Sequence, residues 1–377
     1  KHNTTQPVLV KENDWKKGDL LVQKDLAETL KRIRDNGQKG FYEGKTAELI
    51  IKEMAAGGGI MTLEDLKKYK AKWREPISFN YKKYQIHSMA PPSSGGVALA
   101  QLLGSIEPYP IADWGFQNAK TVHLMVEAER RTYADRAKHL GDADFYNVPT
   151  AQITQKEYIK ARMSDFDESQ ATKSTDIEGG EVPTESEETT HLSIIDNSGN
   201  AVSITTTLNS SFGSKVVVSG AGFLLNNEMD DFSAKPGVPN IYGLIGAEAN
   251  AVAPEKRMLS SMTPTIIERE GKLFMVVGTP GGSTIITSVF QTFVNVAEFG
   301  MTMSEAVQAK RFHHQWLPEK VFYEKNALSS SLDSLQKMGH TLEERDAIGR
   351  VDAILVLENG QLEGAADTRG DDHAAGF

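Results

Sequence analysis

The pattern of apolar and polar residues divides the chain into a helical half and a strand-rich half. Across residues 17–75 apolar side chains recur every three or four positions, as on one face of a helix. The two clearest runs, 26–37 and 46–59, both stop at Asn or Gly, which commonly end helices. A third helix is expected to start at Thr62, because Asp65 three residues later completes a capping-box pattern.

The rest of the first half mixes strands, helices and one unusual acidic stretch. Residues 76–90 alternate with period two, which indicates strands, and the stiff turn PPSSGG leads into a helix at 97–106. A long helix is expected around 117–138. Residues 165–188 are polar, acidic and nearly free of large apolar side chains, which predicts an exposed, mobile loop or linker.

The second half is led by strands. Helices are expected only near 283–299 and 303–310, and the chain finishes with a hairpin at 351–367 that turns at Asn359-Gly360. The border between the two halves therefore falls at residue 189.

A hairpin rich in threonine lies on that border, with strands at 189–195 and 201–209. Its apolar residues all have even numbers: Leu192, Ile194, Val202, Ile204 and Leu208. Side chains alternate between the faces of a strand, so the pairing must keep these residues on one face. Pairing Ile195 with Ala201 achieves this and places Thr207 opposite Thr189. The odd-numbered face is then wholly polar.

Two interpretations of the polar face remain open. It is either the solvent-exposed face of an edge hairpin, or it carries an N-terminal nucleophile. A threonine hydroxyl is a weak nucleophile that needs a base, and the α-amine of Thr189, with a reference pKa of about 8, would serve. That amine exists only after the Glu188–Thr189 bond is cut.

Composition limits the classes of function. The chain has 377 residues, 39% apolar and 24% charged, which suffices for a sizeable core. Its net charge of −10 argues against nucleic acid or an anionic membrane as the main partner. The absence of cysteine excludes disulfides, Cys-ligated zinc and a thiol nucleophile. The sequence contains no apolar run long enough to span a membrane, and its start lacks an apolar signal core.

Longer motifs give a more specific picture. The segments TTHLSIIDNSGNAVSITTTLNSSFGS, NNEMDDFSAKPGVPN, LSSMTPTI, GTPGGSTIIT and RFHHQWLPE closely resemble the γ-glutamyltranspeptidase family. The resemblance extends over essentially the whole chain through GFYEGKTAELI, PPSSGG and ERRTYADR. It implies an α+β fold, an αββα four-layer sandwich of the N-terminal-nucleophile hydrolase type.

The resemblance also implies an activity and a subunit organisation. The family cuts its precursor into a large and a small subunit, and transfers the γ-glutamyl group of glutathione and related amides to water, amino acids or peptides. Residues 1–188 would be the C-terminal part of the large subunit, ending in the acidic linker 165–188. Residues 189–377 would be the small catalytic subunit, and both halves would form one sandwich domain. No cofactor is implied.

Motif by motif, the resemblance assigns the reacting groups. Thr189 would be the cleavage point, with Glu188, and the nucleophile, and Thr207 would support it by a hydrogen bond. Gly281 and Gly282 would form the oxyanion hole, since glycine lets backbone N–H groups approach a ligand closely. Read alone, this Gly-rich loop is only a weak phosphate-binding signal.

The resemblance assigns the substrate-binding residues as well. Asn209, Glu228 and Asp231 would hold the α-amino group, because carboxylates and an amide oxygen suit an ammonium ion. Ser260 and Ser261 would bind the α-carboxylate. Without the family, the acidic residues would be a solvated turn and the serines an ordinary Ser-rich turn.

Tyr242, in the segment 234–246, matches the family's lid loop over the γ-glutamyl pocket, and would meet Asn209 there. Read alone, it is a core or surface tyrosine. His313 and His314 invite a metal or general-base interpretation, but the family motif is structural and the α-amine already supplies a base. The carboxylates near the C-terminus have unconvincing spacing for a metal, so no metal is expected.

Family members carry a long additional N-terminal region that includes the arginine for the substrate α-carboxylate. Without it, this chain is expected to expose apolar surface and to lack that arginine. Export to the periplasm or beyond is implied by the family alone. Two other functions stay open: an unprocessed binding module, for example one that binds nucleotide through GTPGGS, and a β-lactam acylase-type relative. The residues suited to an α-amino acid argue against the acylase.

Overall fold

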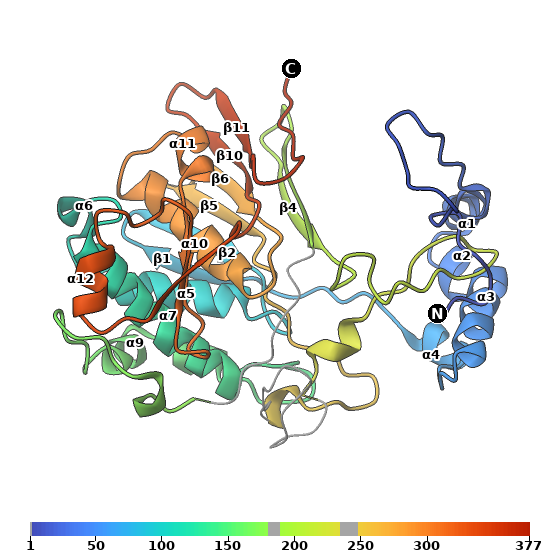
Figure 1. The fold of residues 1–377 in the computed structure, drawn as a ribbon, viewed down its shortest axis with the longest axis horizontal. Coiled ribbons are helices and arrows are strands. Elements are labelled where there is room, and N and C mark those ends of the chain that lie inside the picture. Colours follow the sequence, from blue (N-terminus) through green and yellow to red (C-terminus); the bar gives the residue numbers. More distant parts are fainter. Residues whose placement is uncertain (1, 180–188, 234–247) are drawn as a thin grey trace. The chain divides into compact units, whose positions relative to one another are not determined.

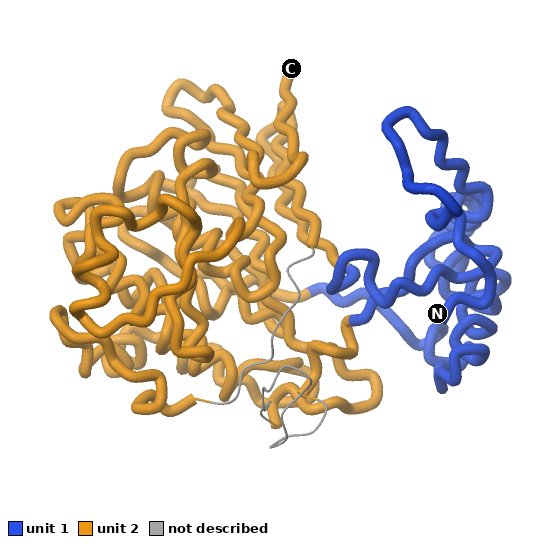
Figure 2. Tube along the Cα trace, viewed as in Figure 1, with its two compact units in different colours: residues 1–73, 208–227 blue, residues 74–207, 228–377 orange. Residues whose placement is uncertain are grey.

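The computed structural model describes residues 2–179, 189–233 and 248–377. The chain forms two compact units (Figure 2). The first contains Lys1–Trp73 and Leu208–Asn227, and the second contains Arg74–Thr207 and Glu228–Phe377. The described residues contain no helix that is both long and apolar enough to cross a membrane.

The first unit is helical, as expected. Its helices are α1 (Lys24–Asn36), α2 (Lys39–Tyr42), α3 (Gly44–Ala56) and α4 (Leu63–Lys68). The capping box at the start of α4 is confirmed, because the Asp65 N–H donates to Thr62 Oγ1 and the Thr62 N–H donates to Asp65 Oδ2. Val218 and Ala221 pack with Ile50 of α3, so 208–227 completes this small core.

The second unit is built on a six-stranded antiparallel sheet in the order β1-β2-β5-β6-β10-β11. The strands are β1 (Ile77–Tyr81), β2 (Tyr84–Ser88), β5 (Thr265–Arg269), β6 (Lys272–Gly278), β10 (Asp352–Val356) and β11 (Leu362–Ala366). Helices α5 (Gly95–Ile106) and α10 (Thr284–Ala297) pack on the sheet, with α7 (Ala119–His139) against α5 (Figure 1). Their apolar side chains form the main core with those of the strands.

Smaller elements surround this frame. The helices are α6 (Ile111–Trp114), α8 (Thr150–Ile153), α9 (Lys156–Arg162), α11 (Met303–Gln308) and α12 (Leu332–Lys337). The strands β7 (Phe312–His313), β8 (Val321–Glu324) and β9 (Leu342–Arg345) form a separate three-stranded sheet. The described residues also form the short 3₁₀ turns η1 (Ser174–Asp176), η2 (Glu228–Asp231) and η3 (Glu248–Asn250).

The threonine-rich hairpin forms a second sheet of β3 (Thr190–Ile195) and β4 (Ala201–Thr206). The predicted register is confirmed, since Ile195 pairs with Ala201 and His191 with Thr205. The turn is held by the Asp196 side chain, which accepts hydrogen bonds from the N–H groups of Ser198 and Asn200.

The hairpin lies with its polar face on the six-stranded sheet, so the expectation of a solvent-exposed polar face is wrong. Ser203 Oγ donates to the Val277 carbonyl at 3.1 Å and Ser193 Oγ to the Asp352 carbonyl at 3.2 Å. These bonds satisfy hydroxyls that burial would otherwise penalise. The apolar side chains point the other way and are 45–51% exposed: Leu192, Ile194, Val202 and Ile204.

The α+β class is confirmed. Among the described residues, three of the four predicted layers are present: helices, the six-stranded sheet and the hairpin sheet (Figure 1). The half-exposed apolar face of the hairpin agrees with the expectation that this chain leaves some apolar surface uncovered.

The first part of the acidic segment is mostly exposed, as expected, but it is anchored at a few points. Within residues 165–179, Ser174 is fully buried and Ile177 is 5% exposed. Arg130 of α7 donates to Ser174 Oγ and Arg131 pairs with Asp165 at 2.8 Å. Composition could not predict these anchoring contacts because the basic residues that make them are distant in sequence. Residues 180–188 lie outside the described part.

Candidate active site

The open end of the hairpin carries the two threonines. The described ladder ends at the pair Thr190–Thr206, so Thr189 and Thr207 form the next position along the two strands. Both are partly buried. Alternation places them on the face that carries His191 and Thr205, whose side chains are hydrogen-bonded at 2.8 Å. Their hydroxyls are thus expected on the inner, polar face.

The hairpin runs along β6 toward the end of that strand. Ser203 contacts Val277, and the His191 ring lies against Gly278, where a Cβ atom would be 2.2 Å from it. The next step along the hairpin is the threonine end, and the next step along β6 is the loop 279–282. We therefore expect Thr189 to face the Gly281-Gly282 loop.

This loop presents two backbone donors. Gly281 and Gly282 are buried and have φ angles of 135° and 55°, which only glycine adopts readily. Within the described part of the chain, neither N–H has a hydrogen-bond partner. A buried N–H without a partner costs about 1–3 kcal/mol, so such a pair suits an anionic ligand or a developing oxyanion.

Buried polar groups hold the residue that follows the loop. The Tyr133 hydroxyl donates to the Ser283 carbonyl, and Ser283 Oγ donates to Gln315 Oε1 at 2.7 Å. His313 Nε2 also bonds Gln315 Oε1, at 2.9 Å. Burial lowers the pKa of His313 to about 3, so its ring is neutral and acts as a fixed donor. The RFHHQW motif thus supports the loop.

His314 has a similar structural setting. Its ring is fully buried, and Nδ1 accepts a hydrogen bond from the Trp316 N–H at 3.0 Å. Burial lowers the pKa of His314 to about 4.

The two serines of LSSM are held by the PPSSGG turn. The Ser94 N–H and Ser94 Oγ both donate to the Ser260 carbonyl, at 2.7 and 2.8 Å. The Ser260 N–H donates to the Pro92 carbonyl at 3.1 Å. Sequence reasoning identified a turn at 91–96 but missed this support, because the partners are more than 160 residues apart.

One further residue behind these serines was also missed. The guanidinium of Arg136, on α7, donates to Ser94 Oγ at 2.8 Å and to Ser261 Oγ at 2.9 Å. Arg136 is 1% exposed. A charged residue within a predicted helix gives no sequence signal that it will hold distant serines, although Arg136 belongs to the ERRTYADR motif.

Asn250 ties the predicted amine-binding turn to the same serines. Its Nδ2 donates to the Asp231 carbonyl at 2.6 Å, and its Oδ1 accepts from the Leu259 N–H at 2.9 Å. Asp231 is 9% exposed. Burial raises the pKa of Glu228, at the start of the same 3₁₀ turn, to about 7. Asn250 therefore links the backbone of the 3₁₀ turn that carries the two carboxyls to Leu259, the residue before the two serines.

Three predicted residues remain. Asn209 belongs to the first unit, where it is 6% exposed, has a φ of 74° and donates to the Asn227 carbonyl at 3.4 Å. Glu188 and Tyr242 lie outside the described residues.

Among the residues that the structure describes, one buried cluster has the composition of a metal site. His123, Glu127 and His340 bring ligand atoms within 4.8 Å of one another. His123 Nδ1 and His340 Nε2 are already hydrogen-bonded at 2.7 Å, and both Glu127 oxygens accept from Arg130 or Arg131. Two neighbouring guanidinium groups oppose a further cation, so these residues fit a hydrogen-bonded core cluster better than a metal centre.

The C-terminal carboxylates are engaged in ion pairs. Asp367 pairs with Arg311 at 2.9 Å, and Asp371 and Asp372 pair with Arg350 at 3.0 and 2.6 Å. These contacts fit a structural role.

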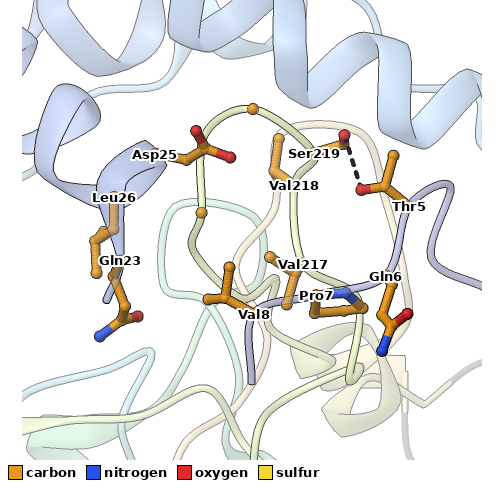
Figure 3. Close-up of a pocket in the computed structure, with 12 residues that line it drawn as sticks. Thr5, Gln6, Pro7, Val8, Gln23, Asp25, Leu26, Val217, Val218 and Ser219 are labelled. Carbon is orange, nitrogen blue, oxygen red and sulfur yellow. Dashed lines mark hydrogen bonds between the residues drawn. The ribbon is translucent and has the colours of Figure 1, made fainter. Parts of the chain in front are cut away.

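The first unit contains a small cavity of about 50 Å³ (Figure 3). Thr5, Val8, Leu26 and Val218 are among its lining residues, and Thr5 Oγ1 bonds Ser219 Oγ at 3.0 Å. None of the predicted site residues lines it.

The sandwich and its inward-facing threonine hairpin define the fold of the N-terminal-nucleophile hydrolases. The chain belongs to the Gamma-glutamyltranspeptidase family, whose model matches residues 2–377. It is 47% identical over 379 aligned positions to a glutathione hydrolase proenzyme of Escherichia coli, and 46% identical over 362 to one of Pseudomonas aeruginosa. These alignments cover 100% and 94% of the chain but only 65% and 64% of the relatives.

A solved structure supports the fold. The crystal structure of cephalosporin acylase from Bacillus halodurans matches with a TM-score of 0.84 and 26% identity. The match covers 96% of this chain and 63% of that protein.

Proposed function

We propose that this chain is the catalytic portion of a γ-glutamyltransferase and glutathione hydrolase that uses Thr189 as an N-terminal nucleophile. The observation that carries the proposal is the pair of buried N–H groups at Gly281 and Gly282, beside the end of β6 toward which the threonine hairpin runs. Family membership supports the substrate class.

The proposed first step is self-cleavage. Thr189 Oγ attacks the Glu188 carbonyl carbon, the peptide C–N bond breaks, and the proton passes to the released amine. Water then hydrolyses the ester, leaving a Glu188 carboxylate and a free Thr189 α-amine. Residues 1–188 and 189–377 would thereby become segments of the large and small subunits, in one sandwich domain.

The proposed second step uses the new amine as base. It accepts the Thr189 hydroxyl proton while Oγ attacks the γ-carbonyl of the donor, and Gly281 and Gly282 stabilise the oxyanion. The γ-amide C–N bond breaks and the leaving amine takes the proton. Water or an acceptor amine then attacks the γ-glutamyl ester and regenerates the hydroxyl. Thr207 orients Thr189 throughout.

Substrate recognition in this proposal uses the residues that the family resemblance assigns. Asp231, Glu228 and Asn209 receive the α-ammonium group, and Ser260 and Ser261 donate to the α-carboxylate. Tyr242 closes the pocket as part of a lid. Glutathione and other γ-glutamyl compounds would be the donors, and location in the periplasm or outside the cell follows from the family.

A β-lactam acylase is the second candidate, favoured by the likeness to cephalosporin acylase. The carboxyls of Asp231 and Glu228 favour a γ-glutamyl substrate instead, because they suit its α-ammonium group, which a glutaryl group lacks. Parallel assays with γ-glutamyl-p-nitroanilide and glutaryl-7-aminocephalosporanic acid separate the two activities.

The deciding experiment is the intact mass of the purified chain after incubation at neutral pH. The parent should yield two fragments that join at Glu188/Thr189, and Thr189→Ala should stay whole. Thr190→Ala is the matched control, since its exposed neighbouring hydroxyl has no proposed role and cleavage should continue. One uncut mass for the parent would contradict self-cleavage and identify the chain as an inactive precursor fragment, and nucleotide binding would then test the binding-module alternative.

A further inference from the structure

Arg136 is a buried cation that donates hydrogen bonds to two serine hydroxyls. Its Nε donates to Ser94 and its Nη2 to Ser261, at 2.8 and 2.9 Å. Burial lowers the pKa of Arg136 to about 10, which leaves the guanidinium charged at neutral pH, and the charge of Asp231 acts in the opposite direction. A buried charge is costly, so the hydrogen bonds that Arg136 makes are important for keeping it here.

The contacts of Arg136 set the direction of two hydroxyl protons. Ser94 Oγ accepts a hydrogen bond from Arg136 and donates one to the Ser260 carbonyl. Ser261 Oγ also accepts from Arg136, and among the described residues its proton has no acceptor. A hydroxyl that accepts from a guanidinium must direct its proton elsewhere, and the charge makes it a stronger donor.

We propose that Arg136 is a positioning residue for the substrate α-carboxylate: it orients and polarises Ser261 so that this hydroxyl donates to the carboxylate. The inference rests on the proposed function and deepens it. In this arrangement the Ser261 hydroxyl lies between the Arg136 guanidinium and the substrate carboxylate. Arg136 would act in addition to any arginine that the longer family members supply.

Two features favour this role over simple packing. The same guanidinium holds Ser94, which fixes the Ser260 backbone, so a single planar group sets the positions of both serines. Lysine could not hold two hydroxyls in this geometry, because it lacks the rigid fork of arginine. Arg131, five residues earlier on α7, is also buried and pairs with the carboxylates of Glu127 and Asp165, which makes it a suitable comparison.

The test compares equilibrium binding of L-glutamate with that of 4-aminobutyrate, which lacks only the α-carboxylate, by calorimetry. Wild type should prefer L-glutamate. Arg136→Met should lower the affinity for L-glutamate about tenfold or more while 4-aminobutyrate binding stays within about twofold, as expected for a charge-assisted hydrogen bond. Arg136→Lys keeps the charge, so its affinity for L-glutamate should fall between those of wild type and Arg136→Met. This variant takes the place of Arg136→Met if that protein does not fold.

Arg131→Met is the matched control, since it removes a buried arginine of the same helix with no contact to Ser261. It should lower the melting temperature but keep the ligand preference. In a Ser261→Ala background, Arg136→Met should cause little further loss, because both act through one hydroxyl.

The possible results separate the two ideas. If wild type prefers L-glutamate to 4-aminobutyrate, and folded Arg136→Met and Arg136→Lys keep that preference, the role of Arg136 is overturned. The proposed carboxylate site would still stand. Equal binding of both ligands by wild type, or binding of neither, overturns the proposed carboxylate site and the inference with it.

Discussion

The imidazole of His191 lies directly against the backbone of Gly278, at the point where the threonine hairpin crosses the end of β6. A Cβ atom at position 278 would be 2.2 Å from His191 Cε1. The ring is fixed in place by Thr205 Oγ1 and Ser193 Oγ, at 2.8 and 3.0 Å. The two sheets therefore approach as closely as they do because residue 278 has no side chain.

Gly278→Ala is expected to displace the hairpin and block self-cleavage. The added methyl group cannot fit without moving His191, and such overpacking typically costs about 1–3 kcal/mol. Because Thr189 is two residues from His191, the shift should also misplace the nucleophile. Denaturant unfolding and the rate of fragment formation by mass spectrometry measure both effects.

Gly364→Ala is the control for this substitution. Gly364 also lies in a strand, and its nearest neighbour to a new Cβ is Ala374 Cβ at an ordinary 3.6 Å. Its stability and cleavage should match the parent. Normal cleavage by Gly278→Ala would show that the hairpin does not need this close contact.

The oxyanion loop offers a second test at Gly281. Its φ of 135° is strained for any other residue, and a Cβ atom there would be 2.5 Å from Thr284 Oγ1. Gly281→Ala should therefore turn the N–H away and lower kcat for a γ-glutamyl donor about 100-fold or more, the usual effect of losing one oxyanion donor.

Gly300→Ala separates strain from chemistry in that experiment. Gly300 also has a positive φ, 66°, but a new Cβ would meet nothing within 4 Å. This variant should be destabilised by about 1 kcal/mol with kcat unchanged. An equal loss of kcat in both variants would argue against an oxyanion role for the loop.

Local patterns predicted local structure well and long-range structure poorly. The even numbering of the five apolar hairpin residues predicted the register of the two strands, and Thr62 with Asp65 predicted the start of a helix. The even numbering of these residues could not predict which face of the hairpin is buried, because that depends on the six-stranded sheet beneath it. The support of Ser260 by Ser94, and of Ser261 by Arg136, joins residues more than 120 positions apart, and single-residue chemistry carries no record of such pairs.

Buried histidines should make the fold sensitive to mild acid. Burial lowers the folded-state pKa of four rings to about 4, 3, 4 and 3: His191, His313, His314 and His340. Unfolded histidine titrates near pH 6.5, so below that pH the unfolded state binds more protons. The stability present above pH 6.5 is therefore lost as pH falls, by up to about 1.4 kcal/mol per pH unit for each ring.

Urea midpoints measured between pH 7 and 5 test this expectation, in a range above most carboxylate titrations. His340→Gln should reduce the slope of stability against pH, even if it lowers stability at every pH. Replacement of the exposed His373 by Gln should leave the slope unchanged. A parental midpoint that does not fall toward pH 5 would contradict the prediction.

Asp352 should have the opposite pH dependence. Burial, with the charges of Asp372 and Asp367, raises its pKa to about 7, while Arg350 acts against the shift. The folded state therefore binds the extra proton, so this contribution to stability is complete below about pH 4 and is lost as pH rises through 7. Asp352→Asn has no such loss, and relative to the parent it should gain about 1–2 kcal/mol between pH 5 and pH 8, a figure reduced for partial solvent screening.

The measurement is the free energy of unfolding of both proteins at these two pH values. Asp346→Asn, at an exposed position, is the matched control and should show the same difference from the parent at both. The result also bears on the hairpin, because the Asp352 carbonyl accepts the hydrogen bond of Ser193 that holds β3 on β10. If Asp352→Asn gains nothing at pH 8, the carboxyl is ionised in the folded protein at neutral pH, and its charge is tolerated beside the other C-terminal carboxylates.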